Sequence, residues 1–249
     1  MKHTIFTPYR VCPLGAHVDH QLGQVTGFAI DRGVELEFDI TEDGTFDLIS
    51  KNYPGHIMFT LEDELEREML WGDFLKAAIV ALSRKYELRR GIKGVIEGTL
   101  PVGGLSSSAA VILTYLNAVC IANDIQITRP EIISNAIWAE RNYIGVNVGK
   151  LDQSCEVYCR KNGLLFLDTL DDSNEIIPIS SNMKPFEIMI VFGGKERQLA
   201  GSAYNTRVDE CKAAAYALQA YAGMDYGNYK DTYLRNVPIG VYLQYKDRL

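Results

Sequence analysis

Residues 101–110 read PVGGLSSSAA and join a strand-like segment, 92–99, to a nearly all-apolar segment, 109–122. Two consecutive glycines, Gly103 and Gly104, allow the backbone to approach a ligand closely. Three serines then place hydroxyls and free backbone N–H groups at the start of a helix, whose dipole favours an anion there. A globular protein must bury a helix as apolar as residues 109–122. The stretch therefore predicts a strand, a phosphate-binding turn and a buried helix.

The same serines also fit a plainer interpretation, because serine is a good N-cap residue for a helix of the core. The serines by themselves do not separate phosphate binding from helix capping. Motifs elsewhere in the chain, described below, favour phosphate binding.

The rest of the chain carries further strand and helix patterns. Apolar and acidic residues alternate through residues 34–40, the two-residue period of a strand with one buried face. Residues 71–86 carry apolar side chains at the spacing of a helix with one buried stripe. Such patterns predict strands over 5–14, 25–40, 164–168 and 187–192 and helices over 71–86, 130–143 and 210–222.

Length and charge limit the function classes. The 249 residues, 47% of them hydrophobic and 23% charged, can bury a core the size of one large domain or one and a half. The 25 basic residues are scattered among 32 acidic ones and give a net charge of -7. Nucleic-acid binding needs clustered Lys and Arg against the phosphates, so no nucleic-acid partner is expected.

The sequence also indicates where the protein works. It contains no apolar run of about 18 residues that would span a bilayer, so no membrane partner is expected. Its first residues lead directly into a strand pattern rather than into a signal-peptide core. We therefore expect a cytoplasmic protein. The sequence specifies no oligomeric state.

Five cysteines occur without a CxxC pair, so the sequence predicts reduced thiols rather than a disulfide framework or a zinc site. Cys155 and Cys159 are four residues apart and could share a helix face as metal ligands. Buried cysteines behave as small hydrophobic residues, and we favour that interpretation for this pair.

Three motifs resemble those of a known family. Residues 101–110 resemble the phosphate-binding motif of the GHMP kinases, PxGxGLSSSA, with a loop one residue shorter. Residues 10–20, RVCPLGAHVDH, resemble the galactokinase sugar-binding signature RVNLIGEHTDY, and residues 149–153, GKLDQ, resemble GIMDQ. The motifs follow the family's order and spacing, and weaker matches at 138–140 and 202–207 extend the resemblance over nearly the whole chain.

The resemblance implies an α+β protein with the GHMP-kinase fold. Residues 1–183 would form the N-terminal domain, which is similar to domain 2 of ribosomal protein S5, and residues 184–249 a partial, ferredoxin-like C-terminal domain. Members of the family continue further and carry a third glycine-rich motif there, whereas no glycine-rich equivalent follows Tyr204. The C-terminal part of the family's chain is therefore expected to be missing.

The resemblance also implies a reaction, the transfer of the γ-phosphoryl group of ATP to the anomeric oxygen of a sugar or uronic acid. Asp152 would act there as a general base or electrostatic orienter, and Arg10 would keep it ionised and offset charge on the phosphoryl group. Glu140 and Ser108 match the family's Mg²⁺ ligands, a carboxylate and a hydroxyl suited to this ion. The family-matched sugar-binding positions are Ala16, His17, Asp19, His20, Gly149 and Tyr204, and those for ATP are Gly103, Gly104, Leu105, Ser106, Ser107 and Ser108.

One departure from galactokinases suggests the substrate. Ala16 stands where the signature has a Glu against the C6 hydroxyl of the sugar. A Glu there would repel a C6 carboxylate, so Ala favours D-galacturonate over D-galactose, and residues 9–20 also resemble galacturonokinases. Candidate cations for the carboxylate are His20 and Lys150, which we favour, and Lys195-Glu196-Arg197.

Two alternatives remain at this stage. Ala16 would also occur in a galactokinase that has drifted or lost activity. A catalytically inactive, truncated sugar- and nucleotide-binding module would likewise retain these motifs.

Overall fold

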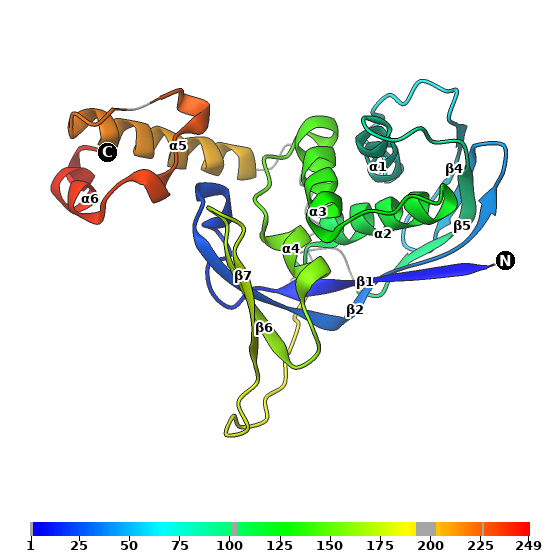
Figure 1. Cartoon of the computed structure of the whole chain (residues 1–249), viewed down its shortest axis with the longest axis horizontal. Helices are drawn as coiled ribbons and strands as arrows, with labels where there is room; N and C mark the ends of the chain where they lie inside the picture. Colours follow the sequence, from blue (N-terminus) through cyan, green and yellow to red (C-terminus); the bar gives the residue numbers. More distant parts are fainter. Residues whose placement is uncertain (1, 101–103, 193–202, 226) are drawn as a thin grey trace.

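The structure is a computed structural model that describes residues 2–100, 104–192, 203–225 and 227–249. Its centre is a mixed sheet with the strand order β4-β3-β5-β2-β6-β7, to which β1 adds by pairing with β2. Helices α1 to α4 gather on one face of this sheet, and α5 and α6 lie together at one end of the molecule (Figure 1). No helix in the described ranges has both the length and the apolar character needed to cross a membrane.

The long strand β2 connects the two halves of the sheet. Its residues 28–38 pair with β1, its residues 34–41 pair with β5, and its first residues, 24–27, pair with β6. Val34, Leu36 and Phe38 are buried while the acidic residues between them are exposed, as the alternation predicts. The strands are β1 (His3–Val11), β2 (Gln24–Thr41), β3 (Thr45–Ser50), β4 (His56–Thr60), β5 (Gly91–Gly98), β6 (Gly163–Asp168) and β7 (Asn174–Pro178).

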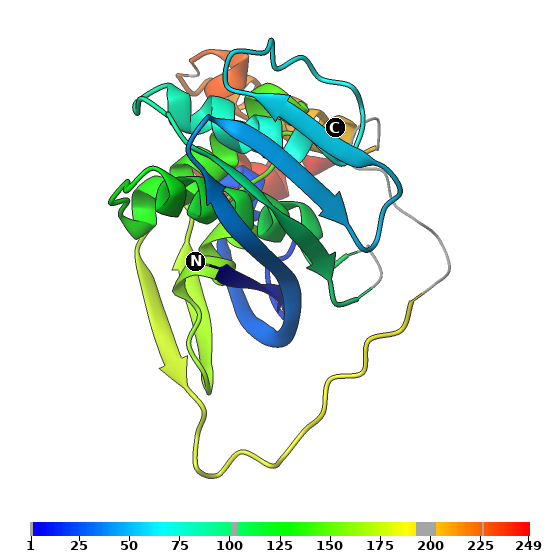
Figure 2. The ribbon, with the colours of Figure 1, turned by 90° about the vertical axis from the view of Figure 1, so that its right-hand side faces the viewer.

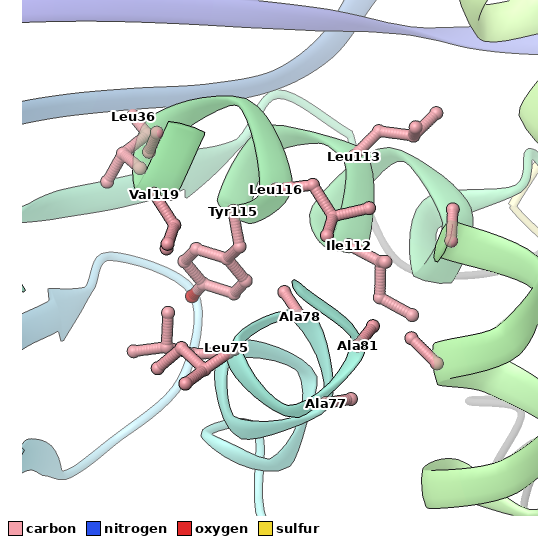
Figure 3. Packing of buried hydrophobic residues seen from close by; sticks show 14 of the residues in the cluster. Leu36, Leu75, Ala77, Ala78, Ala81, Ile112, Leu113, Tyr115, Leu116 and Val119 are labelled. Carbon is pink, nitrogen blue, oxygen red and sulfur yellow. The ribbon is translucent and has the colours of Figure 1, made fainter. Parts of the chain in front are cut away.

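Helix α2 is the buried helix expected after the glycine-serine turn. Its side chains Ile112, Tyr115 and Leu116 have 1% or less of their surface exposed and pack against α1. The small residues of α1, among them Ala78, let the two helices approach closely (Figure 3). Burial of each large apolar side chain contributes about 1.5–3 kcal/mol relative to exposure. This packing fixes the N-terminus of α2 against the sheet.

The remaining helices follow along the chain. The α-helices are α1 (Asp73–Ser83), α2 (Ser107–Ala122), α3 (Arg129–Trp138), α4 (Leu151–Tyr158), α5 (Tyr204–Tyr221) and α6 (Ile239–Tyr245). A π-helical turn, η2 (Ala139–Ile144), continues α3. The 3₁₀ turns are η1 (Asp19–Gln21), η3 (Tyr229–Asp231), η4 (Leu234–Asn236) and η5 (Lys246–Arg248).

The structure confirms most of the predicted elements and contradicts one. The strand predicted over 187–192 is wrong, because this segment runs as an extended chain away from the sheet (Figure 2). Ile188, Ile190 and Phe192 are 43%, 43% and 49% exposed. A strand needs a neighbour for its backbone N–H and C=O groups, and no described strand pairs with this segment.

Helices α5 and α6 belong to the region predicted as a second domain. The segment between α5 and α6 makes two contacts with η1 and β6. The backbone N–H of Leu234 donates to Gln21 Oε1 at 3.0 Å, and Arg235 Nη2 lies 2.8 Å from Asp168 Oδ2. The domain boundary at residue 183 stays a prediction.

Candidate active site

An ion pair between Arg10 and Asp152 lies at the centre of the site. Arg10 is at the end of β1, and Asp152 is in the first turn of α4, so the pair joins the sheet to a helix. Arg10 Nε and Nη2 lie 2.8 Å and 2.6 Å from Asp152 Oδ1. The Asp152 side chain is 29% exposed. One face of this carboxylate is therefore accessible to a ligand.

Arg10 also contacts the glycine-serine turn. Its Nη1 donates to the carbonyl of Gly104 at 3.2 Å, and its backbone N–H donates to the carbonyl of Leu105 at 3.4 Å. Burial opposes the charge of Arg10, but Asp152 outweighs this effect and raises the pKa of the guanidinium. The arginine therefore stays charged while it bridges Asp152 and the turn.

The glycine-serine turn ends in a geometry suited to an anion. Gly104 has φ +70°, and a Cβ atom there would meet no atom within 4 Å. Ser106 precedes α2 with φ +64°, and its side chain makes no capping hydrogen bond. Its buried Oγ has no hydrogen-bond partner in the described chain. Ser106 therefore does not cap α2 through its side chain, and its buried hydroxyl is left without a partner in the described chain.

A buried carboxylate, Glu140, lies in the π-helical turn η2. It is 2% exposed and accepts a hydrogen bond from the Gln153 amide, and the nearby Ser108 hydroxyl acts to lower its pKa. Burial raises its pKa to about 7, and the charge of Asp152 adds to this effect. Glu140 and Ser108 thus present two adjacent oxygens of the kind that Mg²⁺ prefers. The described residues contain no cluster of three or more His, Cys, Asp or Glu side chains that could hold a metal, so phosphate or water oxygens would complete the coordination.

A second buried carboxylate, Asp19, packs against the start of α4. Its Oδ2 accepts the backbone N–H of Leu151 at 3.2 Å, and a Cβ atom on Gly149 would lie 1.9 Å from the same oxygen. Burial and the charge of Asp152 raise the pKa of Asp19 to about 6, against the effect of the backbone N–H donors. Glycine at position 149 is therefore required for Asp19 to lie this close to the start of α4.

The first turn of α5 closes the site from the other side. The ring of Tyr204 meets the ring of His20 edge-on, with the centroids 6.1 Å apart. Burial raises the pKa of Tyr204, and the charges of Asp19, Asp152 and Glu140 raise it further, so Tyr204 lies near all three carboxylates. The arrangement can bind a ligand rich in hydroxyl groups beside an anion held at the turn.

Comparison with known proteins assigns this architecture. The family model of the N-terminal domain of the GHMP kinases matches residues 73–160, which include the glycine-serine turn, α2, Glu140 and Asp152. This segment is a GHMP kinase N-terminal domain. The GHMP kinase fold extends beyond it, because the structure is similar to that of Lactococcus lactis galactokinase complexed with galactose, with a TM-score of 0.82 at 30% identity. The predicted α+β GHMP-kinase fold is confirmed.

Two curated relatives are also sugar kinases. The chain is 33% identical over 267 residues to a galacturonokinase of Arabidopsis thaliana and 31% identical over 208 residues to a galactokinase of Thermosipho africanus. These matches cover 98% and 83% of this chain, and the galactokinase structure covers 91%. The chain spans 62% of the length of the galacturonokinase, 57% of that of the Thermosipho africanus galactokinase and 59% of that of the Lactococcus lactis galactokinase.

Most residues predicted from the GHMP kinase motifs come together in the structure. Arg10 contacts both Asp152 and Gly104, Ser108 lies near enough to Glu140 to act on its pKa, and Gly149 packs against Asp19. Ser107 is the first residue of α2. Ala16 and His17 lie exposed on the loop before η1. Gly103 and residues 195–197 fall outside the described residues, so their predicted roles stay predictions.

Lys150 and His20, the residues favoured as cations for the C6 carboxylate of a uronate, are not free cations in the structure. The Lys150 ammonium is hydrogen-bonded to Asp172. Burial lowers the pKa of His20, and the nearby charges of His17 and Lys212 lower it further, so the ring is neutral at neutral pH. The structure also reveals contacts of two α5 residues that were not among the predicted site residues, Asn205 and Lys212. Asn205 lies in the weaker match at 202–207, whereas no local sequence signal indicates Lys212.

Glu140 leads to an expected pH dependence of stability. Burial raises its pKa from 4.5 to about 7, so between these values the folded protein keeps a proton that the unfolded chain has lost. This stabilisation is complete below pH 4.5 and is lost as the pH rises through about 7. We expect the free energy of unfolding of the parent, minus that of Glu140→Gln, to fall by on the order of 2 kcal/mol from pH 4.5 to above pH 7.

Urea unfolding at a series of pH values measures this difference. Subtracting the free energy of unfolding of the variant from that of the parent removes the contributions of other titrating groups. The raised pKa of Asp19 also makes stability fall as the pH rises, whereas the lowered pKa of His20 makes stability rise with pH. A difference that stays flat or rises with pH would show that Glu140 is ionised in the folded protein.

Proposed function

We propose that this chain forms the sugar- and nucleotide-binding part of an ATP-dependent sugar-1-kinase. The enzyme transfers the γ-phosphoryl group of ATP to the anomeric hydroxyl of a hexose or hexuronic acid. The observation that carries the proposal is Arg10, which contacts Asp152 through Nε and the phosphate-binding turn through Nη1. One side chain thereby links the group that would meet the acceptor sugar to the loop that would meet ATP.

Each residue has a distinct role in this proposal. Asp152 accepts the proton of the anomeric hydroxyl or orients that hydroxyl, and its accessible face allows the contact. Arg10 balances the negative charge on the moving phosphoryl group. Residues 103–108 bind the ATP phosphates, with the free hydroxyl of Ser106 among the donors. Asp19, Gly149 and Tyr204 bind the sugar.

Mg²⁺ would be held by Glu140 and Ser108 in this proposal. Their adjacent oxygens fit a hard cation that takes its other ligands from phosphates and water. The ion would neutralise charge between the phosphates of ATP. A proton on Glu140 competes with the cation, and the raised pKa of this residue makes that competition relevant near neutral pH.

We further propose that the sugar is D-galacturonate rather than D-galactose. Ala16 supports this choice, because it removes the carboxylate that galactokinases place against C6 and opens space there. The similarity to the Arabidopsis thaliana galacturonokinase, which extends over 98% of this chain, supports it as well. Close anions repel by a few kcal/mol when they are partly desolvated, so a Glu at this position would select against a uronate.

Calorimetry with the two sugars tests the substrate. We expect D-galacturonate to bind at least about tenfold more tightly than D-galactose, a difference of about 1.4 kcal/mol, and Ala16→Glu to reverse the order. Equal affinities, or a preference of the parent for galactose, would refute the uronate proposal. A coupled ADP-release assay on the same samples tests catalysis. Binding of ATP and sugar without turnover would favour a sugar- and nucleotide-binding module instead.

A further inference from the structure

A uronate would bring a further carboxylate to a site that already contains several, among them Asp19, Glu140 and Asp152. A partly buried anion needs a cation or several hydrogen-bond donors nearby. Arg10 is paired with Asp152, and Lys150 is hydrogen-bonded to Asp172. These two cations are therefore already paired within the protein.

Helix α5 brings a lysine to the sugar-binding side. Tyr204, Val208 and Lys212 are spaced by four residues and so lie along one face of the helix. Tyr204 contacts the His20 ring, Val208 is 3% exposed, and α5 contacts η1. Figure 1 shows α5 lying over the blue loop that leads into β2. Lys212 is therefore on the face of α5 that carries the contact with η1.

Hydrogen bonds anchor α5 in this position. Asn205 Oδ1 accepts the backbone N–H of Asn147 at 2.9 Å, and its Nδ2 donates to the Gly145 carbonyl at 3.0 Å. Both bonds hold the start of α5 against the loop that precedes Asp152. The Leu234 contact to Gln21 fixes the segment after α5 against η1. Lys212 is therefore carried by a helix whose first turn is attached to the loop before α4.

The Lys212 ammonium has capacity for an anionic ligand. It donates to the Lys230 carbonyl and lies 4.1 Å above the Tyr233 ring. An ammonium has three donors, and within the described ranges no carboxylate lies at ion-pair distance from Lys212. Burial lowers its pKa, while the charges of Asp231 and Asp209 oppose this shift and that of Arg141 adds to it.

Arg141 is another cation, and its charge acts on Tyr204. Its Nε and Nη2 both donate to the Val148 carbonyl, with Nε at 2.8 Å, so the guanidinium is held against the loop before α4. Both Arg141 and Lys212 keep further N–H donors. Lys212 differs in lying on the face of α5 that carries Tyr204.

We propose that Lys212 is the specificity-determining residue that binds the carboxylate of a hexuronate substrate through its ammonium group. This inference rests on the proposed function and extends it. The sugar hydroxyls would be held by Asp19 and Tyr204, and the carboxylate by a residue two helical turns further along α5. The same cation would offer little to a neutral hexose, so the discrimination would come from charge rather than from shape.

Calorimetry on Lys212→Met tests the proposal, because methionine keeps much of the length of lysine and removes its charge. We expect D-galacturonate to bind at least about tenfold more weakly, while the affinity for D-galactose changes by less than about twofold. Lys212→Arg should retain the preference for the uronate. The matched control is Lys230→Met, which removes a neighbouring ammonium and keeps the carbonyl that Lys212 contacts.

The outcomes separate this inference from the proposed function. Unchanged galacturonate affinity in Lys212→Met, with the parent still preferring the uronate, would overturn the role of Lys212 alone. Equal losses for both sugars would show that Lys212 only supports α5, and would overturn it too. A parent that binds neither sugar, or prefers galactose, would overturn the substrate proposal and this inference with it.

Discussion

Asparagine at position 152 is expected to slow phosphoryl transfer at least about 100-fold, which corresponds to about 2.7 kcal/mol of transition-state stabilisation. Asparagine has nearly the same shape as aspartate, but it cannot accept the proton of the anomeric hydroxyl. It also removes the negative charge that pairs with Arg10 Nε and Nη2. The loss should appear in the rate, because the sugar is also held by Asp19 and Tyr204 in the proposed site.

A coupled ADP-release assay with ATP and D-galacturonate measures the rate, and calorimetry measures the sugar affinity separately. The matched control is Asp31→Asn, an aspartate whose side chain is 89% exposed and pairs only with its neighbour Arg32. Exposed pairs of this kind contribute about 0–1 kcal/mol, so the control should behave as the parent. An Asp152→Asn variant that turns over at the parent rate would remove Asp152 from the mechanism.

The sequence predicted elements well where the pattern was long and the burial one-sided. β2 and α2 are examples, because the alternation through Val34–Phe38 and the apolar run of α2 each allow only one kind of burial. The short strands β3, β4 and β7 were missed, since five or six residues carry too little periodicity. The apolar segment 187–192 was assigned wrongly, because composition indicates strand propensity and says nothing about a pairing partner.

The sequence predicted only those site residues that belong to a recognisable motif. Three motifs identified Arg10, Asp152 and the serines, but the contact from Arg10 to Gly104 spans 94 residues and depends on how β1 meets the turn. Lys150 seemed available from its place beside Asp152, and only the fold brings Asp172 to it. Lys212 lies outside every motif, and only the fold brings the helix that carries it to η1. Charge neutralisation at a site is decided by tertiary neighbours, which the order of residues does not reveal.

Alanine at position 149 is expected to lower the rate at least about 100-fold and to weaken sugar binding, because misplacement of reacting groups by about 1 Å has effects of this size. The new Cβ would lie 1.9 Å from Asp19 Oδ2 and 2.2 Å from its Cγ, far inside contact distance. Asp19 is 8% exposed and is held by the Leu151 N–H, so it cannot simply turn away. Either Asp19 or the start of α4 must shift, and α4 carries Asp152.

The matched control is Gly240→Ala in α6, where a Cβ would meet no atom within 4 Å. Alanine in a helix is favoured over glycine by roughly 0.5–1 kcal/mol, so this variant should be as stable as the parent and bind the sugar equally. The two substitutions add the same methyl group, and their comparison isolates the contact with Asp19. If Gly149→Ala kept both the rate and the sugar affinity of the parent, the packing of Gly149 on Asp19 would not be what positions Asp152.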